Sequence, residues 1–255
     1  MGIFNIDEFE KQFGTDPIFY LKFTSRLEYA KDILNGIFYA NSPAFFREKE
    51  LETKERGQGD KNELKYVMPL FDLKFFDQAT NEYQFALKQA SGAIERKADA
   101  DIPIICFVGI PLRKMKIVEQ DDSHIALDFP FSDEEYAIIN EKFGEYCVLL
   151  SASSLLTRLK ELNALVPIEF KPVKYVESNS LEKATAHFNG TTDRFFYKDK
   201  DLDYQMEYRL VIFDKMPLDN KFHVTPFVDN GTASSEAKIM KSRDLKGIRL
   251  FINYK

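Results

Sequence analysis

The sequence predicts one α+β domain that spans residues 1–255 and contains a mixed or split antiparallel β-sheet with flanking helices. Two observations predict this fold class. Short apolar runs of strand length recur along the chain, which holds 24 Phe and 12 Tyr. Capped segments with the apolar spacing of helices lie between these runs. The 255 residues contain no internal repeat and no linker long enough to separate two domains, so a single core is expected.

The first forty residues predict a strand, a helix and a second strand. We expect an amphipathic start at 1–17, a strand at 18–23, a helix at 27–34 that ends at Asn35-Gly36, and a strand at 37–40. Thr24 or Ser25 is the expected N-cap of this helix, and Glu28 completes a capping box. Lys22 then lies near the end of the first strand, where side chains commonly face a cleft.

A charged segment with two glycines follows the second strand. Gly57 and Gly59 lie among polar residues, a pattern typical of a flexible, exposed loop. Loops of this kind on rigid scaffolds often collect ligand contacts. Charge runs are also often plain solvated connectors. Both interpretations stay open for 57–63.

The remaining segments predict further strands and helices. Ser132 opens a helix with Glu135 in the capping-box position, and Gly144 ends it. The segment 102–108 is the most apolar strand. In chain order, we also expect two strands within 64–90 joined by a turn at 77–82, a loop at 91–101, strands at 124–129 and 145–150, a helix at 151–162, an edge strand at 166–176, a helix at 181–188, strands at 221–228 and 248–253, and a helical segment at 233–241.

The stretch 195–213 is the one around which we expect a site to form. From Tyr204 onward the residues alternate with the period of a β-strand that has one buried face. One side carries Tyr204, Met206, Tyr208, Leu210 and Ile212, and the other carries Gln205, Glu207 and Arg209. A carboxylate and a guanidinium on one strand face can fix a ribose hydroxyl and a phosphate. They can equally form an ordinary ion pair that binds nothing, and both interpretations stay open.

Composition and motifs argue against several classes of function. The net charge of −6 gives no broad attraction to nucleic acid. No basic leader and no apolar run of about 18 residues occurs, which predicts a cytoplasmic chain without a membrane partner. Cys106 and Cys147 lie in apolar runs, which is typical of reduced, buried thiols. The sequence contains no Gly-rich phosphate loop, no Cys-x-x-Cys or His-Glu-x-x-His zinc motif and no Gly-x-Ser-x-Gly motif of α/β-hydrolases. The three histidines are far apart, so no metal site is expected.

The order of several short segments resembles a widespread bacterial and phage family of uncharacterised domains. The segments are Phe-Tyr-Leu-Lys-Phe at 19–23, Gly-Ile-Phe-Tyr-Ala-Asn-Ser at 36–42, Phe-Phe-Arg at 45–47, Gly-Asp-Lys-Asn-Glu at 59–63, Ile-Cys-Phe at 105–107, Val-Lys-Tyr at 173–175, and Lys-Asp followed by Tyr-Gln-Met-Glu-Tyr-Arg-Leu within 198–210. Together they span most of the chain. Because each segment is short, the resemblance rests on their order.

A second resemblance is to ADP-ribosyltransferases, whose split sheet holds NAD between a basic or His residue on the first strand and a catalytic Glu on a later one. Lys22 matches the first position, and Gln205-Met206-Glu207 matches the Gln/Glu-x-Glu element. The resemblance implies NAD as cofactor and a Glu207 carboxylate that stabilises oxocarbenium-like charge as nicotinamide leaves. Two departures exist. That family usually carries Arg or His where this chain has Lys22, and Ser151-Ala-Ser153 resembles its Ser-Thr-Ser element only loosely.

These observations lead to one main hypothesis and two alternatives. The main hypothesis is an ADP-ribosyltransferase-like domain of the kind found in toxins and phage-conflict proteins, acting on NAD or a related nucleotide and a protein or nucleic-acid acceptor. Its predicted site consists of catalytic Gln205 and Glu207 and of nucleotide-binding Lys22, Arg47, Asp60, Glu63 and Arg209. The first alternative is a non-catalytic module that binds a nucleotide, another small molecule or a protein. The second is an enzyme that acts on RNA or nucleotide phosphates through Arg47 and Arg209.

Overall fold

The computed structural model describes residues 11, 14, 16–54, 59–121, 123–229, 231 and 235–253. Its fold is α+β, as predicted. The chain packs into two compact units, which are described in turn. Unit 1 comprises Met1–Asn41, Pro103–Pro172 and Tyr204–Lys255, and unit 2 comprises Ser42–Ile102 and Val173–Asp203. The expected amphipathic start at 1–17 and Gly57 lie largely outside the described residues, and one domain over 1–255 stays a prediction.

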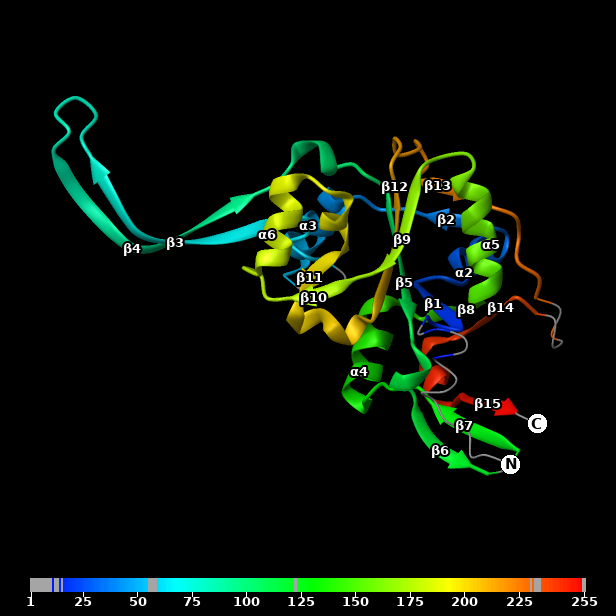
Figure 1. The fold of residues 1–255 in the computed structure, drawn as a ribbon. Coiled ribbons are helices and arrows are strands. Elements are labelled where there is room, and N and C mark those ends of the chain that lie inside the picture. The colour runs from blue at the N-terminus through cyan, green and yellow to red at the C-terminus, as the bar shows by residue number, and fades with distance from the viewer. Residues whose placement is uncertain are drawn as a thin grey trace. The chain divides into compact units, whose positions relative to one another are not determined.

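A six-stranded antiparallel sheet forms the centre of unit 1 over its described residues (Figure 1). The strand order is β14-β8-β1-β5-β12-β9, with β1 Phe19–Thr24, β5 Ile104–Gly109, β8 Tyr146–Ser151, β9 Ile168–Pro172, β12 Glu207–Ile212 and β14 Ala237–Lys241. The apolar runs predicted β1, β5 and β8 closely. The edge position of β9 is confirmed, since prolines are tolerated mainly at a sheet edge, but the strand predicted at 166–176 is divided, because Lys174–Val176 forms a separate strand in unit 2.

The helical prediction for 233–241 is wrong for its described part, because 237–241 forms the edge strand β14. This strand pairs antiparallel with β8 and places Ala237 opposite Leu150. Its side chains alternate, since Ala237 and Ile239 pack on one face of the sheet and Met240 packs on the other. Backbone hydrogen bonds to the edge of β8 thus decide the structure of a segment whose composition is ambiguous.

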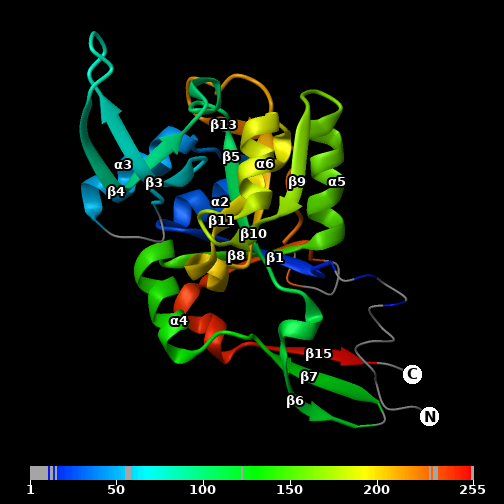
Figure 2. The same ribbon diagram turned by 60° about the vertical axis from the view of Figure 1, so that its left-hand side comes forward.

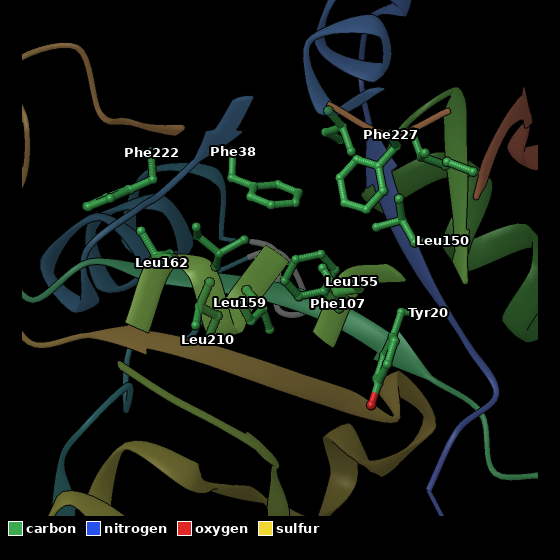
Figure 3. Close-up of a cluster of buried hydrophobic side chains, with 14 of the residues drawn as sticks. Tyr20, Phe38, Phe107, Leu150, Leu155, Leu159, Leu162, Leu210, Phe222 and Phe227 are labelled. Carbon is green, nitrogen blue, oxygen red and sulfur yellow. The ribbon is translucent and has the colours of Figure 1, made fainter. Parts of the chain in front are cut away.

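Two helices and a two-stranded sheet cover one face of the main sheet. These elements are α2 Leu27–Leu34, α5 Ala152–Asn163, and the antiparallel pair β2 Ile37–Tyr39 and β13 Lys221–His223. Figure 3 shows the first core, where Phe38 of β2, Phe107 of β5 and Leu155 of α5 pack together. All three side chains are buried. The apolar stripe that predicts α5 is therefore the face that the helix buries.

The opposite face packs against a three-stranded sheet and a short helix. These elements are β6 Lys116–Gln120, β7 His124–Asp128, β15 Arg249–Asn253 and α4 Asp133–Ile138, with turns at Leu112–Lys114, Ile139–Phe143 and Ser242–Gly247. Leu21 of β1, Leu127 of β7 and Tyr136 of α4 are buried in this second core. Strand β6 was not predicted, because its residues are mostly exposed and carry no apolar face.

The helix caps of unit 1 were predicted in one case out of two. Ser132 Oγ accepts a hydrogen bond from the Glu135 backbone, and the Glu135 carboxylate accepts one from the Ser132 backbone, so α4 has its predicted capping box. The predicted cap of α2 is wrong, because its N-cap is Arg26, whose side chain makes no capping hydrogen bond. The bounds of α2 still match, since burial of its apolar face stabilises a helix more than a cap does.

Over its described residues, unit 2 contains two helices, a short parallel strand pair and a long hairpin. These elements are α3 Pro43–Thr53, α6 Leu181–Asn189, β10 Lys174–Val176 parallel to β11 Tyr197–Asp199, the hairpin β3 Tyr66–Phe76 and β4 Tyr83–Ile94, and short 3₁₀ turns at Lys97–Asp99 and Thr192–Phe196. The predicted hairpin turn at 77–82 is confirmed. Asp77 Oδ1 accepts hydrogen bonds from the backbone nitrogens of Ala79 and Thr80 there.

Helix α3 lies between the second strand and the glycine segment, where no element was predicted. Ser42 is its N-cap and accepts a hydrogen bond from the Phe45 nitrogen, and Pro43 takes the first helical position. Both residues are helix-start signals that can be recognised in the sequence. The helix was missed because the segment is dominated by charged residues and has no continuous apolar stripe.

Candidate functional site

In unit 1, Lys22 on β1 lies where the main sheet begins to split. Over these two fully described strands, β1 pairs with β5 at two positions, Tyr20 with Gly109 and Leu21 with Val108. Beyond them, the Lys22 ammonium donates a hydrogen bond to the backbone oxygen of Cys106 at 2.7 Å. A side chain therefore replaces a backbone partner at the point where the ladder opens.

Glu207 and Arg209 form a buried ion pair on β12. Arg209 Nε donates to Glu207 Oε1 at 2.5 Å, and the two residues are 5% and 1% exposed. Residues two apart on a strand share a face, as predicted. Their burial excludes the interpretation as a solvated surface pair. Both residues make further contacts, as a buried ion pair requires if it is to offset desolvation.

Lys22 is electrostatically coupled to this pair. Burial lowers the pKa of the Lys22 ammonium, while Cys106 and the Glu207 carboxylate oppose that shift. The Lys22 Nζ also lies 5.5 Å from the centroid of the Phe107 ring. By strand alternation, Lys22 lies on the sheet face of Tyr20 and Phe107, whereas Glu207 lies on the other face, so the two charges interact across the opening of the β1–β5 ladder and not within one face. A desolvated cation and a carboxylate at such an opening can hold a phosphate and polarise a hydroxyl group.

The predicted strand from Tyr204 is wrong at its start. Lys200–Gln205 forms a 3₁₀ helix, and β12 begins at Glu207. Met206 joins them with φ +43°, a left-handed conformation that breaks the alternation. Met206 accordingly packs into the second core rather than beside Tyr208. Gln205 is buried at the end of the 3₁₀ helix and does not extend the strand face of the ion pair.

Aromatic rings pack on the sheet face opposite the ion pair. Tyr20 packs edge-on against Tyr208 and against Phe170, each at a centroid distance of 5.2 Å. Burial raises the pKa of Tyr208 to about 12, so its hydroxyl stays protonated. Gly109 makes room for this packing, because a Cβ there would lie 2.5 Å from the Tyr208 ring.

The serine element of the ADP-ribosyltransferase resemblance lies at the end of β8. Ser151 pairs with Phe19, and its Oγ lies 2.9 Å from that of Ser153. Lys22 pairs instead with Val148, three residues back along β8. At about 3.3 Å per residue, Ser151 is on the order of 10 Å along the strand from Lys22. The serines are thus displaced from the Lys22 end of the split.

Three other predicted binding residues lie in unit 2, Arg47 within α3 and Asp60 and Glu63 in the segment after it. Asp60 and Glu63 are buried, which corrects the prediction of an exposed loop for 59–63. Asp60 Oδ1 accepts a hydrogen bond from the Asn62 nitrogen at 2.9 Å. Arg47 Nη1 donates to the Glu63 backbone oxygen at 3.1 Å. These side chains hold backbone groups that burial has removed from water.

Asp199 and Lys183 complete the charge cluster of unit 2, and neither was predicted as a site residue. Lys183 Nζ lies 3.2 Å from Asp199 Oδ1, and Ser178 Oγ donates to the same oxygen at 2.9 Å. Asn62 Nδ2 donates to the other Asp199 oxygen at 3.4 Å. One local signal was present, since Lys198 and Asp199 directly follow the aromatic run 195–197, although Lys and Asp are usually exposed unless they are paired.

Asp60 and Asp199 have pKa values that shift in opposite directions. Burial, followed by the charge of Glu63, raises the pKa of Asp60 to about 6, although Lys198 opposes the shift. Burial also acts to raise the pKa of Asp199, but Lys183 and the hydrogen bonds that Asp199 accepts hold it below its usual value. The cluster thus places a carboxyl that titrates near neutral pH beside one that stays ionised, a combination found at functional sites and in structural networks.

The described residues include an open groove but no metal-binding group. The groove, of about 510 Å³, runs along α6 in unit 2 and contains none of the predicted site residues. Over the same described residues, no group of three or more His, Cys, Asp or Glu could hold a metal ion. No helix in this part of the chain is long and apolar enough to span a bilayer.

Function has to be argued from this chain's own residues. No protein-family model, no curated protein and no solved structure matches the sequence. A fold shared with other proteins would in any case not establish a reaction, because function depends on the chemistry of a site. Among the described residues, the two buried charge clusters offer the chemistry on which a function can be based.

Proposed function

We propose that this protein is ADP-ribosyltransferase-like and binds NAD or a related nucleotide in unit 1, around Lys22 and Glu207. The coupling of the Lys22 cation to the Glu207 carboxylate, where the β1–β5 ladder opens, is the observation that supports it most. These are the two positions that the resemblance marks. In the main sheet, β1, which carries Lys22, and β12, which carries Glu207, lie on either side of β5.

Each residue of this site has a distinct role in the proposal. Lys22 supplies positive charge to a phosphate or ribose of the nucleotide. As the bond to nicotinamide breaks, positive charge develops on the ribose, and the Glu207 carboxylate stabilises it. Arg209 orients the Glu207 carboxylate through its Nε. Because Glu207 is buried, nucleotide binding has to widen the open end of the β1–β5 ladder.

Two further parts of the proposal rest on the resemblances. The acceptor of the ADP-ribose group is a protein or a nucleic acid, and the biological setting is a toxin or a phage–host conflict. Asp60, Glu63 and Arg47 of unit 2 remain predicted nucleotide contacts. Asp60 Oδ1 accepts from the Asn62 nitrogen and Arg47 donates to the Glu63 backbone oxygen, so a nucleotide contact through either side chain would require it to exchange a partner.

A second candidate is a nucleotide-binding module without catalysis. The closed Glu207–Arg209 pair favours it, because Glu207 Oε1 is already engaged. In that case Lys22 binds the ligand, and the ion pair has a structural role. The alternative in which Arg209 clamps a phosphate has less support, since this side chain is 1% exposed.

Release of nicotinamide from NAD tests the catalytic proposal. Wild-type protein given NAD with protein and nucleic-acid acceptors is expected to release nicotinamide. Glu207→Gln should lower that rate on the order of 10²-fold or more, because it removes charge where charge develops in the transition state. Glu134→Gln, an exposed position on α4 of the same unit, is the matched control and should leave the rate unchanged.

Stability has to be measured alongside turnover, because Glu207→Gln leaves Arg209 without its carboxylate. Removing one partner of a buried ion pair costs about 3–5 kcal/mol. The double variant Glu207→Gln/Arg209→Met removes both charges and should melt closer to wild type while remaining inactive. Wild type that binds NAD without releasing nicotinamide supports the second candidate instead, and wild type that binds no nucleotide contradicts both.

A further inference from the structure

The hairpin of β3 and β4 exposes large apolar side chains. Figures 1 and 2 show it extending away from α3 and α6, the helices of its own unit. We call its outer part, residues 70–89, the ribbon. Six large apolar residues of the ribbon are exposed, namely Phe71 (63%), Phe75 (40%), Phe76 (52%), Tyr83 (58%), Phe85 (51%) and Leu87 (44%). Single exposed apolar residues are ordinary, but six on one hairpin mark an interaction surface.

The ribbon has one apolar face. The antiparallel register places Leu73 opposite Leu87 and Phe75 opposite Phe85. The two phenyl rings stack, with centroids 4.4 Å apart and planes inclined by 14°. Lys74 and Ala86, the pair between them, lie on the other face. This alternation is the pattern of a strand that buries one face, although Phe75 and Phe85 remain about half exposed.

We propose that the apolar face of the ribbon is an interface with a second copy of this chain. Two ribbons related by a two-fold axis present identical faces, so Phe75 and Phe85 of one copy pack against the same residues of the other. A two-stranded ribbon alone is marginally stable in water. Packing two ribbons face to face supplies each with the apolar layer that it lacks.

The exposed area of the ribbon is close to what a dimer needs. An aromatic side chain can bury roughly 150–250 Å². The register places Phe75, Phe85 and Leu87 on the apolar face, and these three supply about half of the exposed apolar area. With all six residues, the ribbon offers on the order of 600 Å² of apolar side chain. That value reaches the upper end of about 300–600 Å² for the largest patch on a typical monomer. It also approaches the roughly 800 Å² that each partner contributes to a standard interface, before backbone atoms are counted.

The charges of the ribbon favour a second copy over nucleic acid or lipid. Its charged residues are Asp72, Lys74, Asp77, Glu82 and Lys88, three acids and two bases. Nucleic acids and anionic membranes attract clusters of Lys and Arg, which the ribbon does not have. Two nearly neutral ribbons can approach without strong repulsion, even though the whole chain carries a net charge of −6.

Sedimentation equilibrium over a wide range of protein concentration tests this proposal. Wild-type protein is expected to change from monomer to dimer. Phe75→Ser/Phe85→Ser should weaken the dimer by roughly 100-fold or more, because central aromatic residues dominate interface energies. The matched control is Lys74→Ser/Ala86→Ser, which alters the neighbouring pair on the other face and should leave the dimer unchanged. Circular dichroism verifies the fold of each variant.

A fluorescence measurement locates the contact. The chain contains no Trp, so Phe85→Trp places a single tryptophan on the apolar face. Its emission should shift to shorter wavelength as the protein concentration rises, whereas the emission of Lys74→Trp should stay constant. The proposal is overturned if wild type stays monomeric at the highest concentration, even if it then binds a different protein through the ribbon. It is equally overturned if Phe75→Ser/Phe85→Ser dimerises as tightly as wild type.

Discussion

At the scale of single residues, the buried charges of unit 1 neutralise each other, whereas those of unit 2 are compensated only in part. In unit 1, the Glu207 carboxylate and the Arg209 guanidinium neutralise each other on one face of a strand. In unit 2, Asp60 lies beside Glu63 with only partial compensation from Lys198, and the pKa of Asp60 rises as a result of burial and of this neighbouring charge. The ionised form of Asp60 is therefore unfavourable in the folded protein.

This imbalance makes stability depend on pH. The pKa of Asp60 is about 6 in the folded protein and ordinarily 3.8, so the folded state binds more protons between these values. The contribution of Asp60 to stability should accordingly fall as the pH rises through this window and stay constant above about pH 6. Asp60→Asn keeps an oxygen for the Asn62 nitrogen but removes the charge. It should stabilise the protein by about 1–3 kcal/mol near pH 8 and change little near pH 4.

Thermal denaturation at both pH values measures this effect. Asp101→Asn, at an exposed position of the same unit, is the control and should change stability little at either pH. An Asp60→Asn variant that is less stable than wild type near pH 8 would show that the Asp60 carboxylate is favourably paired in the folded state.

The sequence identifies the polar residue types of both clusters but not their burial. Glu207 and Arg209 share a strand face as the alternation predicts. Asp60 and Glu63, by contrast, were predicted to lie in an exposed loop, because helix α3, which contacts this segment, was not predicted. Glu50 of that helix accepts a hydrogen bond from the Lys61 nitrogen at 2.8 Å, a contact across eleven residues that no local pattern reveals.

At the scale of elements, Gly109 at the end of β5 allows β12 to approach with Tyr208. Gly109→Ala should destabilise the protein by about 1–3 kcal/mol, because the new methyl group overlaps the Tyr208 ring, which packs against Tyr20. Chemical denaturation measures this change. Gly92→Ala on β4 is the control, since its Cβ would meet Leu70 at 3.6 Å, an ordinary contact distance. Equal stability of the two variants would contradict the packing role of Gly109.

Several elements with local signals were predicted, although α3 was missed despite its Ser42 cap, and elements decided by tertiary contacts were not. The capping box of α4 and the Asn35-Gly36 end of α2 act within a few residues, so the sequence shows them. Strand β14 depends on the free edge of β8, which lies far away in the chain. The polar and apolar residues alternate through 204–212, yet the strand begins only at Glu207, after a 3₁₀ helix. Met206 between them takes a left-handed conformation that the residue pattern does not predict.

At the scale of the whole molecule, two compact units each bury a cluster of charges, and one of them carries the ribbon. The α+β class follows from the recurring apolar runs and the caps between them. The division into units does not, because it is made by contacts between segments distant in sequence, such as 42–102 with 173–203. Both units keep costly buried charges, a feature more typical of sites than of surfaces.

The central claim is that Lys22 and Glu207 mark a nucleotide site. Calorimetric titration of NAD into wild type and Lys22→Met tests it most directly. Lys22→Met keeps the apolar stem, and loss of the hydrogen bond from the ammonium to the Cys106 backbone oxygen should cost about 1–3 kcal/mol, so the fold should persist. We expect wild type to bind NAD and Lys22→Met to bind it at least roughly tenfold more weakly, the effect of losing one charge-assisted contact. Wild-type protein that is folded but takes up no NAD, or a Lys22→Met variant that binds NAD as tightly as wild type, would contradict it.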